Sequence, residues 1–208
     1  MDNFGVILFA EIRAAWNWKA TCICASFGHM PVPEAFTQFF QTREAPELGP
    51  GPRSDVQPKP KLDQALDKAL RGLALSEDNQ QLIRALVLLW HDYLEPAHLI
   101  AQGVENADGA YVHAIMHRRE PDFSNAAYWF RRVGTHPVFD PLREKVAELA
   151  EGKKESPLQN LVLGRTWDPL VFIKECERVK RYSLPDSHLR QVQRMEFEEL
   201  LDWLGKVG

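Results

Sequence analysis

The chain has 208 residues, of which 45% are hydrophobic and 26% charged, and its formal net charge is −4. This length and composition suit one globular domain, or one domain with an appended arm, with enough apolar residues for a sizeable core. The weakly acidic balance gives no reason to expect nucleic acid or an anionic membrane as partner, although a local basic patch stays open.

The N-terminal stretch MDNFGVILFAEIRAAWNWK has the features of neither a signal peptide nor a membrane span. Its apolar run covers residues 4–10 and is followed by Glu11 and Arg13. A signal peptide begins with basic residues, whereas this chain has Asp2, and a spanning helix needs about 20 apolar residues. We therefore expect a cytoplasmic protein.

Residues 1–45 are rich in aromatic side chains but weakly patterned, with plausible helices near residues 4–19 and 33–43. They predict an N-terminal arm, which either packs on the main domain or stays poorly ordered. Residues 46–61 hold five prolines and two glycines. Proline removes backbone donors and glycine adds conformational freedom, so this stretch predicts a linker before a helical domain at residues 62–208.

The cysteines are too few and too unevenly placed for a disulfide framework. There are three of them: Cys22, Cys24 and Cys176. The first two form C-x-C without a second pair, so we interpret all three as ordinary thiols.

From residue 62 the apolar pattern sharpens into helices. In residues 62–73 apolar side chains recur at i, i+3, i+4 and i+7, which predicts an amphipathic helix. Ser76 is expected to cap the next helix. Within residues 82–90 only Arg84 is charged, so we expect this helix to be buried on nearly every side.

Later helices have recognisable beginnings. Asp140 and Asp168 are expected as N-caps, because each precedes a proline that suits the first helical position. A last helix is expected at about residues 186–204. Residues 158–164 are the one strand-like run, and a short helix explains them equally well. The sequence therefore predicts an all-α protein.

The central part of the chain contains an internal repeat. Matching Asp92-Tyr93 to Asp122-Phe123 gives an offset of 30 residues, whereas matching Ala85 to Ala114 gives 29. Each unit predicts a helix, a tight turn with an aspartate and an aromatic residue, and a second helix. The aspartate can cap that second helix.

The second unit resembles a tetratricopeptide-type repeat. Ala114 and Ala126 match the small residues of the motif's two helices, and Asp122-Phe123 matches its turn. The aromatic position, the last inward position and the terminal proline are matched by Phe130, Val133 and Pro137. His113 and His117 depart from the motif, which usually has leucine and tyrosine there, and Pro121 stands where it usually has glycine. The resemblance covers residues 79–137 and implies stacked antiparallel helical hairpins, an α–α superhelix, and often partner binding. The same region is also similar to a widely occurring protein family, a likeness that implies no activity.

Histidines in the two units form one candidate site. His113 and His117 are four residues apart, so they share a helix face and could hold one metal ion together with His98. The zinc-protease signature needs a glutamate after the first histidine, and Ala114 stands there instead. Glu95 and His98 form E-x-x-H, the spacing of di-iron sites, but only one such motif is present.

Three interpretations of these histidines stay open. One is a mononuclear site for zinc or iron, made by the three histidines with Glu95 or Asp92. Another is that the histidines are half-buried polar residues, hydrogen-bonded across the helical hairpin. The third is a site that binds a small molecule without metal.

A second candidate group is basic and aromatic. Arginines end two predicted helices: Arg118, Arg119, Arg131 and Arg132. Basic residues are favoured there by the helix dipole alone. Alternatively, their guanidinium groups suit carboxylate or phosphate, and Trp129 could stack on a ring or fill the core.

Two functions follow from these patterns. The first is a non-enzymatic helical-repeat interaction module without a cofactor, whose groove receives a protein, a peptide or a small anionic ligand. That groove would be lined by His98, His113, His117, Arg118, Trp129 and Arg132. The alternative is a metal-dependent enzyme with a divalent metal such as zinc or iron, held by His98, His113, His117 and Glu95 between the two hairpins.

Overall fold

The computed structural model describes residues 34–154 and 156–206, which belong to one compact unit, Pro31–Gly208. Every regular element in these ranges is helical, which confirms the all-α class, and none is long and apolar enough to cross a membrane. The elements are α1 (Glu34–Thr37), the 3-10 helix η1 (Gln38–Phe40), α2 (Lys59–Leu70), α3 (Glu77–Trp90), α4 (Leu94–Ala101), α5 (Ala107–Arg119), α6 (Phe123–Val133), α7 (Phe139–Ala150), α8 (Leu158–Leu161), α9 (Pro169–Tyr182) and α10 (Ser187–Leu204). The expected helix at 4–19 and the C-x-C pair lie outside the described residues.

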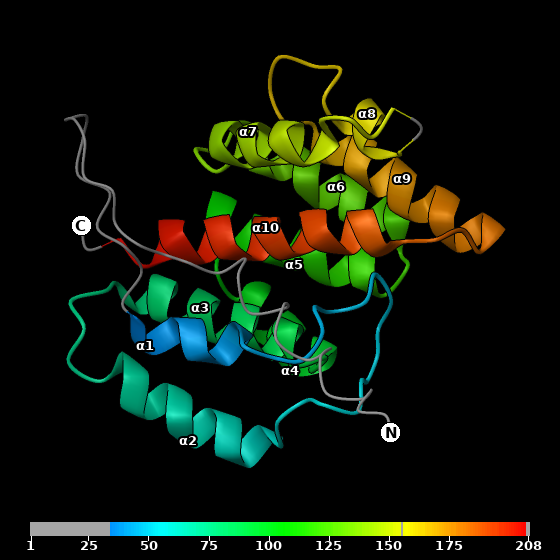
Figure 1. Ribbon diagram of the computed structural model, residues 1–208. Coiled ribbons are helices and arrows are strands. Elements are labelled where there is room, and N and C mark those ends of the chain that lie inside the picture. The colour runs from blue at the N-terminus through cyan, green and yellow to red at the C-terminus, as the bar shows by residue number, and fades with distance from the viewer. Residues whose placement is uncertain (1–33, 155, 207–208) are drawn as a thin grey trace, which may run out of the picture. The chain divides into compact units, whose positions relative to one another are not determined.

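The helices pack as two consecutive hairpins with further helices around them. Helices α3 and α4 form the first hairpin, α5 and α6 the second, and α4 packs against α5. Helix α10 contacts both α3 and α7, and α9 packs on α6 (Figure 1). The site described below lies where the two hairpins meet.

Local chemistry sets most helix starts. The Ser76 hydroxyl accepts a hydrogen bond from the Asn79 amide, and the Asp168 carboxylate accepts one from the Leu170 amide, so both predicted caps are confirmed. The Asp140 prediction was wrong, because α7 starts at Phe139 and places Asp140 in its first turn. Phe139 is buried, so core packing rather than a polar cap sets this start.

The core contains aromatic residues from the segment that was predicted to be an arm. Phe40 packs on Trp90 with 4.7 Å between ring centroids, and Phe197 of α10 lies 5.6 Å from the same indole. Phe36 and Phe39 are also buried. The compact unit therefore includes residues before 45.

Hydrogen bonds of buried charged side chains hold the segment that was predicted to be a linker against the helices. Asp92 accepts from the backbone amide of Arg53 at 2.8 Å and from its Nε at 3.0 Å. Arg119 donates to Asp92 at 2.6 Å and to the carbonyls of Glu47 and Gly49. The side chains of Arg119 and Asp92 are fully buried. Residues 46–58 are thus part of the folded body, and residues 59–61 begin α2.

The turns inside the two hairpins share a backbone conformation at an offset of 29 residues. Tyr93 has φ −90° and ψ 69°, and Asp122 has φ −90° and ψ 72°. Asp92, the residue before Tyr93, has a positive φ of 63°. Asp122 caps α6 as expected, whereas Asp92 does not cap α4, because the N-cap position is held by Tyr93; the Asp92 carboxylate pairs with Arg53 and Arg119 instead.

Candidate metal centre

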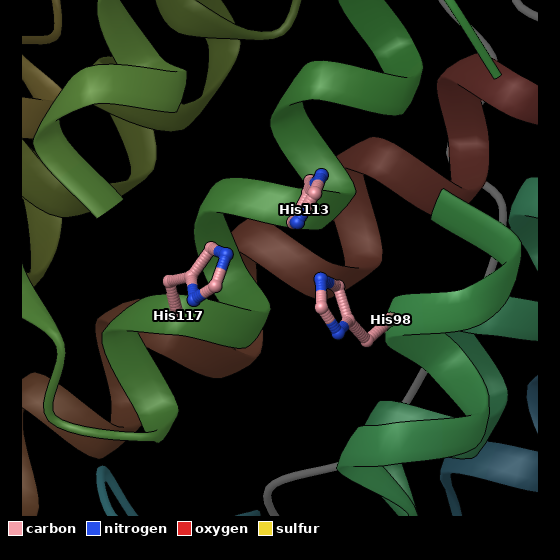
Figure 2. A group of neighbouring side chains, drawn as sticks. All are labelled: His98, His113 and His117. Carbon is pink, nitrogen blue, oxygen red and sulfur yellow. The ribbon is translucent and has the colours of Figure 1, made fainter. Parts of the chain in front are cut away.

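Three histidines meet between α4 and α5. His98 lies in the last turn of α4, and His113 and His117 lie one turn apart on α5. Ring centroids are 4.7 Å apart for His98 and His113, 5.3 Å for His98 and His117, and 4.8 Å for His113 and His117. Figure 2 shows the three rings gathered in the space between the two helices. One potential ligand atom of each lies within 4.8 Å of the others.

The start of α5 brings this helix close to the preceding chain. The Asn106 side chain caps the helix by accepting from the Gly109 amide at 2.8 Å. A Cβ atom on Gly109 would lie 2.1 Å from the Val104 carbonyl oxygen, so only glycine permits this approach. From Gly109 to Arg119 every residue of α5 is buried, and its two histidines therefore face protein rather than open solvent.

His113 is a buried polar side chain without a partner. It is 3% exposed, and neither ring nitrogen has a hydrogen bond among the described residues. A buried polar group normally has one, and losing it costs free energy. For this residue the structure does not provide the cross-hairpin hydrogen bond that one interpretation of the sequence expected.

His91 shows what an ordinary buried histidine looks like in this fold. It is fully buried, its Nδ1 accepts from the Gln57 amide at 3.2 Å, and its Nε2 donates to the Phe39 carbonyl at 3.0 Å. Both ring nitrogens of His91 thus have hydrogen-bond partners, whereas neither ring nitrogen of His113 has one among the described residues.

His117 is held on both sides by polar groups. Its Nδ1 lies 3.3 Å from Glu120 Oε2, and the Asn125 amide nitrogen of α6 lies 3.0 Å from its Nε2. The same amide nitrogen also lies 3.4 Å from Nδ1; because its contact with Nε2 is shorter and Glu120 lies beside Nδ1, these neighbours favour a neutral His117 that accepts at Nε2 and carries its proton on Nδ1. The sequence interpretation missed both partners, although His117 and Glu120 are visible as H-x-x-E.

Burial keeps two of the three imidazoles neutral. It lowers the pKa of His113 to about 4, with smaller contributions from the neighbouring His117 and His98 rings. Burial also lowers the pKa of His117, against the opposing charge of Glu120. A metal ligand must be unprotonated, so at neutral pH both rings offer a free electron pair.

His98 forms the more open side of the cluster. Its side chain is 27% exposed, and its Nδ1 lies 3.8 Å from Glu95 Oε2. Glu95 is itself 72% exposed, and its carboxylate is not among the grouped ligand atoms. The structure thus brings the three predicted histidines together. Glu95 lies beside His98 and outside the group of ligand atoms. Asp92 is also outside this group, and its carboxylate is bound by Arg53 and Arg119.

The predicted groove residues are divided. The indole of Trp129 stacks on the His113 ring, and the exposed Arg132 lies over that indole with 5.3 Å from its guanidinium carbon to the ring centroid. Arg118, in contrast, is fully buried and makes a two-pronged ion pair with Glu196 of α10. The structure therefore does not place Arg118 in a groove with the histidines.

The cluster fits a divalent transition metal. Nitrogens on tetrahedral zinc are about 3.3–3.4 Å apart for bond lengths of roughly 2.0–2.1 Å. The widest separation here is 4.8 Å, so binding requires the side chains to close inward. Imidazole nitrogen suits zinc, iron, copper and nickel. Among the described residues this is the one group of histidine, cysteine or carboxylate side chains with such geometry.

Comparison of the chain with protein families, curated proteins and solved structures found no match.

Proposed function

We propose that this protein is a metal-dependent enzyme with a mononuclear centre held by His98, His113 and His117. One observation carries the proposal: both ring nitrogens of His113 are buried without a hydrogen-bond partner among the described residues, and the ring lies beside the imidazoles of His98 and His117. A bound cation would satisfy one of these nitrogens and offset the cost of burying it.

The charges around the cluster favour a cation over an anionic ligand. Glu95 and Glu120 each place a carboxylate within 4 Å of a cluster histidine. Arg118, which could have attracted an anion, is neutralised by Glu196 inside the core. Arg132 is separated from His113 by the indole of Trp129. The charged groups nearest the histidines are therefore acidic.

Three protein ligands are typical of catalytic rather than structural zinc sites. Structural sites are closed by four protein ligands, whereas catalytic sites keep a position for water or substrate. Here three histidines are grouped, and the partial exposure of His98 leaves a side from which water can reach the centre. A divalent ion bound there supplies a Lewis acid that lowers the pKa of a bound water, so the reaction class we propose is hydrolysis or hydration.

Metal content tests the proposal directly. Protein purified without an affinity tag is expected to carry about one zinc, iron or other divalent ion per chain. The variant His98→Gln/His113→Gln is expected to carry less than a tenth of that amount. His188→Gln is the matched control, because His188 bonds to Ser156 far along the chain from the cluster. Equal metal content in the double variant, or none in the wild type after addition of zinc, iron and manganese, contradicts the proposal.

Activity is tested with a general probe of metal-activated water. Hydrolysis of para-nitrophenyl acetate is expected to be lost on chelation and restored by adding the metal. Hydrolysis that survives complete removal of the metal would show that the centre does not act as a Lewis acid.

A second candidate function is an interaction module. Leu99 on α4 and Tyr128 on α6 are exposed large apolar side chains, each next to a residue at the cluster. Together with the tetratricopeptide-type resemblance, these two side chains are the basis of a second proposal, binding of a protein or peptide across the two hairpins. Metal-free protein that retains its fold would favour this function.

A further inference from the structure

Two of the three cluster histidines have a glutamate on the same helical side, three residues away. Glu95 Oε2 lies 3.8 Å from His98 Nδ1, and Glu120 Oε2 lies 3.3 Å from His117 Nδ1. In both pairs the carboxylate lies on the Nδ1 side of the ring, at close contact for His117 and at the longer distance of an ion pair for His98. In each ring Nε2 is the nitrogen on the side away from the carboxylate.

The contacts of His117 favour one tautomer in the absence of a metal. The Asn125 amide nitrogen lies nearer Nε2 (3.0 Å) than Nδ1 (3.4 Å), and Glu120 lies beside Nδ1, so a ring proton on Nδ1 satisfies both neighbours. The electron pair of Nε2 is then available, and a metal ion would replace the amide proton as its partner. Figure 2 shows His98 and His117 each with one ring nitrogen turned toward the space shared with His113.

We infer that Glu95 and Glu120 are outer carboxylates of the metal centre, which fix His98 and His117 as Nε2 ligands. This inference rests on the proposed function. It assigns Glu95 a role different from that of direct ligand, and it gives Glu120 a role that the sequence pattern had not suggested. Metal-bound histidines generally donate their other ring N–H to a carboxylate, carbonyl or water, which orients the ring and raises its basicity.

The surroundings of the two carboxylates agree with this role. Glu95 is largely exposed, and Glu120 is 38% exposed. Their cluster histidines are their ion-pair partners among the described residues. Each therefore keeps its negative charge in contact with solvent while facing a ring. Three neutral imidazoles leave the full charge of a divalent ion uncompensated, and two nearby carboxylates reduce that imbalance.

Substitution of the glutamates tests the inference. We would measure zinc affinity by competition with a chromophoric chelator for Glu95→Ala, Glu120→Ala and Glu120→Gln. Each alanine variant is expected to bind one ion with an affinity about 10- to 100-fold below that of the wild type. Glu120→Gln is expected to lie between, because its amide oxygen still accepts from Nδ1–H. Glu144→Ala is the control, an exposed acid on α7.

A second readout separates this role from a general effect on the fold. With cobalt in place of zinc, the visible absorption bands are expected to shift in the Glu120→Ala protein, while its metal-free unfolding midpoint stays at the wild-type value. Affinities and spectra equal to those of the wild type in all glutamate variants overturn the inference and leave the metal centre standing. A wild-type chain that binds neither zinc nor cobalt overturns the proposed function, and this inference with it.

Discussion

The rings of His113 and Trp129 stack at 4.0 Å between centroids, with 24° between their planes. This contact joins α5 to α6 and covers a face of the histidine that lacks hydrogen bonds. Stacking holds a ring plane in place but leaves the nitrogens at its edge free to bind. The indole therefore orients His113 without competing for its electron pairs.

Replacement of Trp129 is expected to weaken metal binding without removing a ligand. Trp129→Ala should lower the free energy of unfolding by roughly 2 kcal/mol and reduce zinc affinity, because His113 gains rotational freedom. Trp129→Phe keeps an aromatic face and should retain most of both. Chelator competition and urea unfolding measure the two quantities; an alanine variant with unchanged affinity would show that the stack does not orient the ligand.

Stability of the metal-free protein should fall on acidification because of His113. Its folded pKa of about 4 lies below the ordinary value of 6.5, so the unfolded chain binds more protons between these two pH values. The free energy of unfolding therefore decreases as pH falls from about 6.5 to about 4, by on the order of 3 kcal/mol for this residue. Urea unfolding of wild type and His113→Gln with chelator present isolates the effect, since His91 and His117 titrate in both proteins. Parallel stability curves for the two proteins would contradict the assignment.

Loss of the Asp92 charge should release the segment before α2. Asp92→Asn leaves the buried Arg119 without a counter-charge, and leaves Arg53 with only Asp55 at 3.9 Å, which costs about 3–5 kcal/mol. Asparagine tolerates the positive φ of this position, so the backbone is not the cause. We expect faster amide exchange across residues 46–58. Glu177→Gln, in an exposed pair with Arg181, is the control and should cost about 0–1 kcal/mol; an equal effect in both variants would argue against the anchoring role.

Arg118 is expected to be structural. Arg118→Met strands the Glu196 carboxylate in the core and should cost about 3–5 kcal/mol, while the double variant Arg118→Met/Glu196→Leu should recover much of that loss. Because Arg118 does not lie in the histidine cluster, the double variant should bind zinc with wild-type affinity. Zinc affinity that falls in the stable double variant would place Arg118 at the site after all.

Local patterns in the sequence predicted what local chemistry determines. The Ser76 and Asp168 caps and the buried character of α3 follow from neighbouring residues along the chain. The spacing of His113 and His117 likewise put both on one helix face. The partners of Arg118 and Arg119 could not be predicted in this way, because helix-dipole arguments concern only the helix that carries them, and Glu196 is 78 residues away from Arg118.

The same limit explains the segment that was predicted to be a linker. Its prolines and glycines were interpreted as signs of a flexible chain. In the structure, however, backbone carbonyls of this segment accept hydrogen bonds from Arg119 and Gln193. The composition of a segment indicates its own conformational preferences, but it does not indicate which hydrogen-bond donors from distant parts of the chain will contact it. At the candidate metal centre, the sequence contains Glu120 three residues after His117, but this spacing alone does not predict which ring nitrogen the carboxylate faces. The structure places it beside Nδ1.

X-ray absorption at the zinc edge tests the central claim most directly. For zinc-loaded, tag-free protein we predict nitrogen or oxygen scatterers at about 2.0 Å, with outer-shell scattering from three imidazole rings and loss of that pattern in His98→Gln/His113→Gln. A sulfur shell at about 2.3 Å would place the metal on cysteine, and zinc with fewer than two imidazoles would place it elsewhere on the chain. Either result would contradict a three-histidine centre between α4 and α5.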